Sequence, residues 1–251
     1  MARDFELTYE SIAKRIDHSL LLPTMTDQDL AEGCQLAARY QVASVCIKPY
    51  SVARAAEWLR DSGVHVGTTV GFPHGGHLTS VKVFEAERAM DDGATELDMV
   101  VNVGDVLSGN WGAVRDDLAA ITAAAHARGA IVKVIFENCY LQDSHKRRLC
   151  EICGEVNADY VKTSTGFGTG GATHADLILM RAAAPAHVKL KAAGGVRDLD
   201  AAIEVTRLGC DRIGASRTAE ILDALKARLE GRAAAFHGKP DAAVEAPGGG
   251  Y

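Results

Sequence analysis

Charged residues interrupt several segments of this sequence whose other residues are mostly apolar and β-branched. Asp98 lies in ELDMVVNVG, Lys162 in DYVKTSTG and Lys191 in HVKLKAAGG, and Lys133 interrupts IVKVIFE in the same way. A lysine or aspartate is rarely buried unless it is paired, because the charged group loses its hydrating water. These residues are therefore candidates for a functional site.

Two lysines and one carboxylate that meet in a pocket have a definite chemical use. Burial and a neighbouring cation both lower the pKa of a lysine, so that part of it is a neutral amine near pH 7. A neutral amine attacks carbonyl groups and forms a Schiff base, and Asp98 would pair with the remaining ammonium group or position a water for proton transfer. The residues alone do not say which lysine attacks. Two other interpretations stay open: a structural ion-pair network, and a sugar-phosphate isomerase or epimerase with Asp98 as its base.

Short β-rich segments alternate with longer amphipathic segments, and this alternation must position the charged residues. Strand starts recur about every 30 residues, the length of a βαβ step, and about eight steps fit in 251 residues. The pattern predicts an α/β fold, a single-domain (β/α)8 TIM barrel over residues 1–232; an open doubly wound sheet is the competitor. We expect strands at 16–21, 44–47, 64–70, 96–101, 131–136, 160–162, 188–191 and 212–213, and helices such as 52–61, 79–90, 114–127, 144–156, 199–208 and 217–229.

In such a barrel the chemistry lies at the carboxyl ends of the strands. Lys162 and Lys191 both stand at predicted strand ends, so we expect them to face one another across the mouth of the barrel. From about residue 233 the pattern stops, and residues 233–251 contain few large apolar groups. This composition predicts a short flexible C-terminal tail, which ends in Tyr251.

Glycine-rich turns follow the last three predicted strands. Residues 166–171 read GFGTGG and match the dinucleotide fingerprint G-x-G-x-x-G, but they follow the sixth strand, and Lys191 stands where an acidic ribose partner is expected. A run of exposed backbone N–H groups that binds phosphate is the better interpretation. Gly194, Gly195 and the turn Gly214–Ser216 support it, because barrels often bind phosphate after strands seven and eight. Ordinary tight turns and helix capping are the alternative.

Composition excludes several other classes of protein. Lys plus Arg number 27 and Asp plus Glu number 33, a net charge of −6 without charge blocks, which argues against a protein that coats nucleic acid or an anionic membrane. No run of about 18 apolar residues predicts a membrane span, and no secretory segment is visible, so we expect a cytoplasmic protein with its six cysteines reduced. His74 and His77 are too few for a catalytic zinc, and the pair Cys150 and Cys153 has no second pair nearby. We expect no metal.

Eight segments of the sequence resemble deoxyribose-phosphate aldolase. They are IDHSLL (16–21), ASVCIKP (43–49), TVGFPHG (69–75), SVKVFEAERAMDDGATELDMVVNVG (80–104), VKVIFE (132–137), YVKTSTGFGTGGAT (160–173), VKLKAAGGVR (188–197) and IGASR (213–217). The resemblance runs in register from about residue 16 to 230. It implies a (β/α)8 class I aldolase that cleaves 2-deoxy-D-ribose 5-phosphate to D-glyceraldehyde 3-phosphate and acetaldehyde, in deoxyribonucleoside catabolism. It implies no metal or organic cofactor, because the iminium group is the electron sink. A catalytically silent phosphosugar-binding barrel is a further alternative.

The resemblance also assigns roles to residues. Lys162 is the Schiff-base lysine, Lys191 the second lysine and Asp98 the proton-relay carboxylate. Arg217 stands where several relatives have a small residue, and Leu22 and Asn138 also depart from the pattern. Tyr251 matches, in kind, a C-terminal tyrosine that is proposed to visit the site in some relatives. The expected substrate-binding set is Asp17, Ser19, Cys46, Thr165, Gly166, Gly194, Gly195, Gly214, Ser216 and Arg217. The expected partners are a sugar phosphate, aldehydes and a second copy of the chain in a homodimer.

Overall fold

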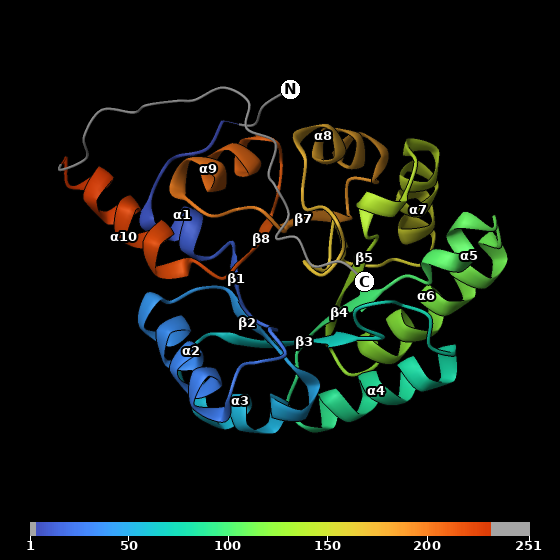
Figure 1. The fold of residues 1–251 in the computed structure, drawn as a ribbon, viewed down its shortest axis with the longest axis horizontal. Helices are drawn as coiled ribbons and strands as arrows, with labels where there is room; N and C mark the ends of the chain where they lie inside the picture. Colours follow the sequence, from blue (N-terminus) through green and yellow to red (C-terminus); the bar gives the residue numbers. More distant parts are fainter. Residues whose placement is uncertain (1–3, 232–251) are drawn as a thin grey trace.

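The computed structural model describes residues 4–231 and shows a closed barrel of eight parallel strands (Figure 1). The strands follow one another around the barrel in chain order, and β1 pairs with β8 to close it. This confirms the predicted α/β (β/α)8 fold and excludes the open sheet. The strands are β1 (Ile16–Leu20), β2 (Ser44–Ile47), β3 (His65–Val70), β4 (Glu96–Val100), β5 (Ile131–Ile135), β6 (Tyr160–Lys162), β7 (Lys189–Ala193) and β8 (Arg212–Ala215).

Helices surround the barrel on its outside (Figure 1). Two of them, α2 and α8, fill the ring between the helices expected from the sequence. The helices are α1 (Tyr9–Ala13), α2 (Asp27–Tyr40), α3 (Val52–Trp58), α4 (Thr79–Asp91), α5 (Val103–Leu107), α6 (Trp111–His126), α7 (Asp143–Glu155), α8 (His174–Ala183), α9 (Leu199–Arg207) and α10 (Thr218–Leu229), with 3-10 turns η1 (Pro49–Ser51) and η2 (Asn138–Tyr140). The predicted tail, residues 233–251 with Tyr251, lies outside the described residues, and the domain boundary at 232 stays a prediction.

Left-handed residues end the helices and turn the chain back into the barrel. Gly63, Gly93 and Gly209 have φ of +73°, +104° and +95°, values that glycine adopts without a Cβ penalty. Gln41 and Asn157 reach φ of +54° and +56° after α2 and α7 without being glycine.

Apolar strand residues fill the space between strands and helices. Val45, Leu97 and Leu190, for example, are fully buried within one continuous core. Because successive side chains of a strand point to opposite faces, the polar residues that alternate with them point into the barrel. The lumen of this barrel is consequently charged, while its outer layer is apolar.

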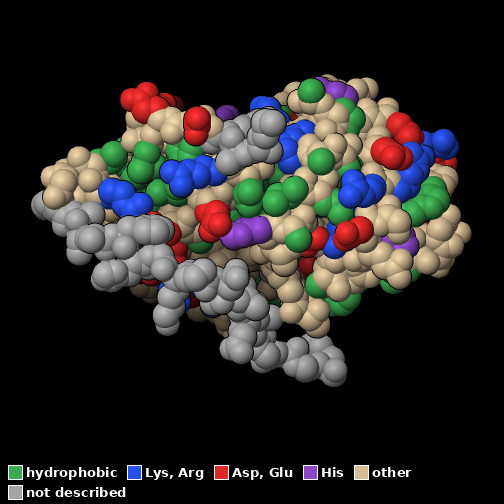
Figure 2. Space-filling view, turned by 90° about the horizontal axis from the view of Figure 1, so that it is seen from above, with side chains coloured by type: hydrophobic (Ala, Val, Ile, Leu, Met, Phe, Trp, Pro, Cys, Tyr) green, Lys and Arg blue, Asp and Glu red, His purple; other side chains and the backbone are tan. Residues whose placement is uncertain are grey.

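The outer surface carries both signs of charge. Lys and Arg side chains lie interspersed with Asp and Glu side chains on the face shown in Figure 2. Within residues 4–231, the helices are all too short or too polar to cross a membrane.

Candidate active site

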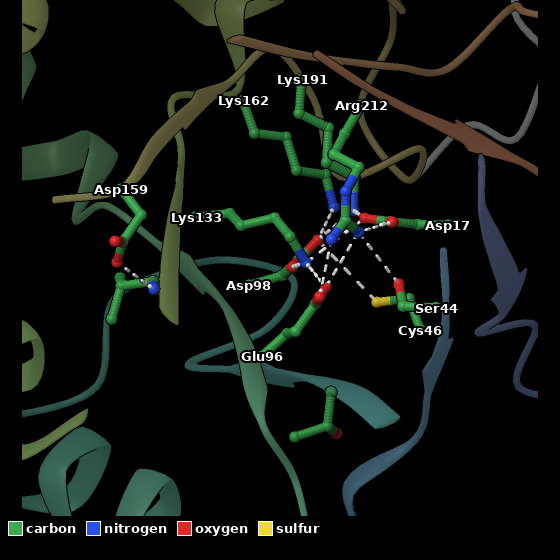
Figure 3. A network of polar contacts seen from close by, with 12 residues as sticks. Asp17, Ser44, Cys46, Glu96, Asp98, Lys133, Asp159, Lys162, Lys191 and Arg212 are labelled. Carbon is green, nitrogen blue, oxygen red and sulfur yellow. Dashed lines mark hydrogen bonds and ion pairs between the residues drawn. The ribbon is translucent and has the colours of Figure 1, made fainter. Parts of the chain in front are cut away.

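Lys162 and Lys191 are neighbours on adjacent strands. They are paired in the register of β6 with β7, and their Nζ atoms lie 2.6 and 2.7 Å from the same oxygen, Oδ2 of Asp98. The expectation that they face one another across the mouth is therefore wrong. Strands six and seven of a barrel closed in chain order lie side by side, so their inward side chains point the same way (Figure 3).

A third lysine binds the other oxygen of Asp98. Lys133 Nζ lies 2.8 Å from Asp98 Oδ1 and 2.7 Å from Glu96 Oε2, and its side chain is fully buried. The sequence marks Lys133 as a charged strand residue but gives it no role. Figure 3 shows it reaching Asp98 from the neighbouring strand β5.

Three further charged groups continue the cluster toward the amino ends of the strands. Asp17 Oδ2 accepts from Lys191 Nζ at 2.5 Å, and Arg212 donates to Asp17 and to Glu96 Oε1, the latter at 2.7 Å. Sequence reasoning missed Glu96 and Arg212, because they open strands and look like ordinary surface charges there. The spacing in β4 could have indicated Glu96: it lies two residues before Asp98, so the two side chains share one face of the strand.

The ion-paired groups of this cluster carry a net positive charge when every lysine is protonated. It holds the cations Lys133, Lys162, Lys191 and Arg212 and the carboxylates Asp17, Glu96 and Asp98, so the full sum is 4 − 3 = +1. An uncompensated charge in a dry interior is costly. One neutral amine removes that excess.

The surroundings select Lys162 as that amine. Burial lowers the pKa of Lys162, and the nearby Lys191 ammonium lowers it further, so that the single carboxylate of Asp98 does not restore the ordinary value. Burial also lowers the pKa of Lys191, but the carboxylates of Asp17 and Asp98 outweigh it and leave this pKa raised. Asp98 itself is buried, yet the three lysines hold its pKa well below the usual range. Lys162 is thus the lysine best able to attack a carbonyl group.

A cavity of about 920 Å³ opens above the two lysines at the carboxyl ends of the strands. It brings together most of the residues that the sequence assigned to substrate binding, and Lys162 and Lys191 form part of its wall. From that set it is lined by Asp17, Ser19, Cys46, Thr165, Gly166, Gly194, Gly195, Gly214 and Ser216. Asp98 lies beneath the floor, fully buried.

Arg217 is the exception among the expected substrate-binding residues. It is exposed at the N-cap of α10 and is not part of the cavity wall, because the chain has already turned into the helix there. Arg197, which follows the turn after β7, lines the cavity instead. The expected role of Arg217 in substrate binding stays a prediction, and Arg197 was not among the residues expected to bind substrate, although it lies only two residues after Gly195.

Three small-residue turns form one side of the cavity. Gly166, Gly194 and Gly195 have φ of +88°, +79° and +97°. The turns after β6 and β7 touch through their backbones: a Cβ on Gly171 would lie 2.5 Å from the carbonyl oxygen of Gly194, and the N–H of Ala172 donates to that oxygen at 3.0 Å. Ser216 completes this side where α10 begins. Backbone N–H groups in such turns, at a helix start, suit a phosphate.

Comparison with known proteins matches this arrangement to one family. A family model described as DeoC/LacD family aldolase matches residues 11–217, most of the chain. The chain belongs to the DeoC/LacD aldolase family. The deoxyribose-phosphate aldolase of Rhodopirellula baltica is 57% identical over 221 residues, which cover 88% of this chain and 92% of the relative. That of Thermococcus kodakarensis is 45% identical and covers 84% of this chain and 96% of its own length.

A solved structure agrees with these relatives. The deoxyribose phosphate aldolase of Aeropyrum pernix, described as a tetramer, superposes with a TM-score of 0.82 at 32% identity. The alignment covers 88% of this chain and 93% of that chain. This DeoC/LacD aldolase therefore shares with its relatives both the barrel and most of its length.

The cysteines and histidines that the sequence singled out add no further reactive group or metal site among the described residues of this aldolase. Burial raises the pKa of Cys46 to about 11, so its thiol stays protonated beside Asp98 Oδ2, at 3.9 Å. Cys150 and Cys153 are buried in α7, away from the cavity wall. Within residues 4–231, His74 and His77 belong to no group of three or more His, Cys, Asp or Glu side chains that could hold a metal ion.

Proposed function

We propose that this aldolase cleaves 2-deoxy-D-ribose 5-phosphate reversibly to D-glyceraldehyde 3-phosphate and acetaldehyde, through a Schiff base on Lys162. The observation that carries the proposal is the lowered pKa of Lys162, which is buried at the floor of an open cavity beside Asp98 and Lys191. The names of the close relatives give the substrate.

The proposed reaction starts with addition of the neutral Lys162 amine to the aldehyde carbon C1 of the open-chain sugar. Loss of water gives an iminium ion. Removal of the proton from the C3 hydroxyl then breaks the C2–C3 bond and moves its electron pair into an enamine on Lys162. Glyceraldehyde 3-phosphate leaves, C2 is protonated, and water hydrolyses the iminium to acetaldehyde and the free amine.

Asp98 and Lys191 are proposed to manage the protons of these steps. Asp98 Oδ2 accepts from both lysine nitrogens, at 2.6 and 2.7 Å, so it joins the reacting nitrogen to a second proton donor. Asp17 holds Lys191 from its other side at 2.5 Å. Positioned donors and acceptors of this kind accelerate proton transfer by about 10²–10⁴-fold.

The phosphate of the substrate is proposed to lie against Gly166, Gly194, Gly195 and Ser216, with Arg197 nearby. All of them line the cavity that Lys162 opens into. Because a bound phosphate fixes one end of the sugar, its binding energy also orients C1 toward the amine.

Trapping the imine tests this proposal. Acetaldehyde and borohydride should leave an irreversible ethyl adduct on Lys162, found by peptide mapping, and inactivate the enzyme. Lys162→Arg keeps the positive charge but has no nucleophile, so its cleavage rate should fall by at least about 10³-fold and the adduct should disappear.

The control for this variant is Lys146→Arg. Lys146 is also buried and ion-paired, at 2.6 Å to Asp176, but it is no part of the cavity wall. The Lys146→Arg variant should stay active and be labelled at Lys162. An enzyme that turns over the sugar phosphate without any adduct would instead be a non-covalent isomerase or epimerase, and one that binds it without turnover a silent barrel.

The same proposal includes a cytoplasmic location and self-association. Sugar phosphates are charged and do not cross membranes unaided, which favours the compartment where they are made. Leu78, the residue before α4, and Val81 and Phe84 in its first turns are 74%, 46% and 69% exposed, and exposed apolar groups of this kind mark contact surfaces. We propose a homodimer, for which light scattering would give twice the chain mass of 26.6 kDa.

A further inference from the structure

Glu137 is a buried carboxylate at the mouth of the barrel to which the mechanism gives no role. It follows β5, is 3% exposed and has φ of +57°, in the left-handed region that residues other than glycine rarely adopt. The next residue, Asn138, donates its N–H to the carbonyl oxygen of Thr163 at 3.0 Å. The pairing of β5 with β6 thus continues past both strands and carries Glu137 to the loop that follows Lys162.

The carboxylate of Glu137 is occupied by that loop. The N–H of Thr165 donates to Glu137 Oε1 at 3.1 Å, and the Thr165 hydroxyl donates to Oε2. The same hydroxyl oxygen accepts from the N–H of Phe167 at 3.0 Å. Glu137 therefore fixes both ends of the turn Thr165–Gly166–Phe167. It binds Thr165 directly, and the Thr165 hydroxyl in turn binds the N–H of Phe167.

Packing above the carboxylate agrees with these hydrogen bonds. A Cβ on Gly168 would lie 3.0 Å from the carboxyl carbon of Glu137, so the loop rests directly on this group. On the other side, Thr163 Oγ1 donates to the carbonyl oxygen of Ala193 and accepts from its N–H, both at 3.1 Å. The loop is held between β5 and β7.

Gly166 lies at the centre of this held turn and lines the cavity. Its φ of +88° sets the direction in which the neighbouring N–H groups point. We propose that Glu137 is a positioning residue for the phosphate of the substrate: it holds residues 165–167 in the conformation that binds the phosphate and takes no part in carbon–carbon bond cleavage. This inference rests on the proposed function for its substrate.

Two substrates separate this role from a general structural one. Glu137→Gln retains an acceptor for the Thr165 N–H but not for its hydroxyl, and Glu137→Ala removes both acceptors. We expect the KM for 2-deoxyribose 5-phosphate to rise about 10-fold in the first variant and about 100-fold in the second, because misplaced donors lose binding energy. Turnover of unphosphorylated 2-deoxyribose, and labelling of Lys162 by acetaldehyde and borohydride, should change less than about twofold.

Glu85→Gln is the matched control. Glu85 also holds a loop by its backbone, since Glu85 Oε2 accepts from the N–H of Gly71 at 2.7 Å, but this is the loop after β3. The Glu85→Gln variant should leave the preference for the phosphorylated substrate unchanged. Equal losses on both substrates in the Glu137 variants, or an unchanged preference, would overturn the inference.

Titration calorimetry with inorganic phosphate tests the inference independently of turnover. Binding to the unliganded enzyme should weaken about 10-fold or more in Glu137→Ala, and equal binding by variant and wild type would overturn the inference. If the wild-type enzyme fails to cleave the sugar phosphate, the proposed function fails, while this binding measurement still decides the role of Glu137.

Discussion

Asp98 is the residue on which the three lysines of the barrel converge. Its Oδ2 accepts from Lys162 and Lys191, and its Oδ1 accepts from Lys133 at 2.8 Å. One carboxylate therefore has two opposed effects on Lys162. It orients the amine for attack, and it favours the ammonium form, which cannot attack.

Asp98→Asn separates these two effects. Loss of the carboxylate lowers the pKa of Lys162 further, because the attraction that opposes burial is gone. The kcat should fall about 10²–10⁴-fold, because the variant lacks the carboxylate that accepts protons. Trapping of acetaldehyde on Lys162 should nevertheless persist to lower pH than in the wild type. The pH dependence of borohydride labelling measures this shift.

The control for Asp98→Asn is Asp117→Asn, which removes the partner of the buried Lys82, at 2.6 Å, outside the cavity wall. It should leave the pH dependence of labelling unchanged. A shift of labelling to higher pH in Asp98→Asn would contradict the assigned electrostatics.

At the scale of elements, the loops after β6 and β7 act as one unit. Gly171 and Gly194 meet backbone to backbone, and Ala172 N–H donates to the carbonyl oxygens of both Ala193 and Gly194. Neither loop can shift without the other. The side of the cavity that we propose to bind phosphate therefore depends on a contact that admits no side chain.

Gly171→Ala tests this contact. The new Cβ would meet the Gly194 carbonyl oxygen at 2.5 Å, so one backbone must move. We expect a loss of about 1–3 kcal/mol in the free energy of unfolding and a KM for the phosphorylated substrate at least about 10-fold higher. Gly112→Ala in α6, where an added Cβ meets nothing within 4 Å, should change neither quantity adversely. Equal behaviour of the two variants would show that the contact is not required.

At the scale of the whole molecule, closure of the barrel joins the first strand to the last helix. His18 in β1 lies with Nδ1 2.8 Å from Oγ1 of Thr218, the first residue of α10. Burial lowers the pKa of His18 to about 4. The closed barrel thus holds this imidazole neutral at a pH where the unfolded chain binds a proton.

This linkage predicts how stability depends on pH. Between pH 6.5 and about 4 the unfolded state binds a proton at His18 and the native state does not. The contribution of neutral His18 to the free energy of unfolding is therefore complete above pH 6.5. It is lost as the pH falls toward 4, with a slope of up to about 1.4 kcal/mol per pH unit. His18→Asn should reduce this slope in denaturant titrations. An unchanged slope in His18→Asn would mean that His18 is not held neutral.

The end of the chain gives the second prediction at this scale. Tyr251 lies outside the described residues, and we predict that it assists proton transfer at the substrate methyl carbon. Tyr251→Phe or removal of Tyr251 should slow exchange of the acetaldehyde methyl protons with deuterated water by at least about 10²-fold, as for loss of a general acid. Labelling of Lys162 should be unaffected. Unchanged exchange, followed by NMR, would refute the role.

Much of this protein could be predicted from short stretches of sequence. Strands and helices follow from local periodicity, and β2 and β6 were placed to the residue. The ends were predicted less well: β8, for example, continues through Gly214 to Ala215, because pairing with β1 and β7 overrides the low strand preference of glycine. Lys162, Lys191 and Asp98 were identifiable because a charge within an apolar strand is costly wherever that strand lies.

The tertiary structure alone decided which groups meet. The register of β6 against β7 puts Lys162 beside Lys191, and closure of the barrel makes partners of Arg212 and Asp17, which are 195 residues apart in sequence. It also places Arg197 on the cavity wall and brings Glu137 beneath the loop of Thr165. The physical reason is that hydrophobic periodicity depends on near neighbours in the chain. The pKa of a buried lysine depends instead on every charge within a few ångströms, from whichever strand it comes.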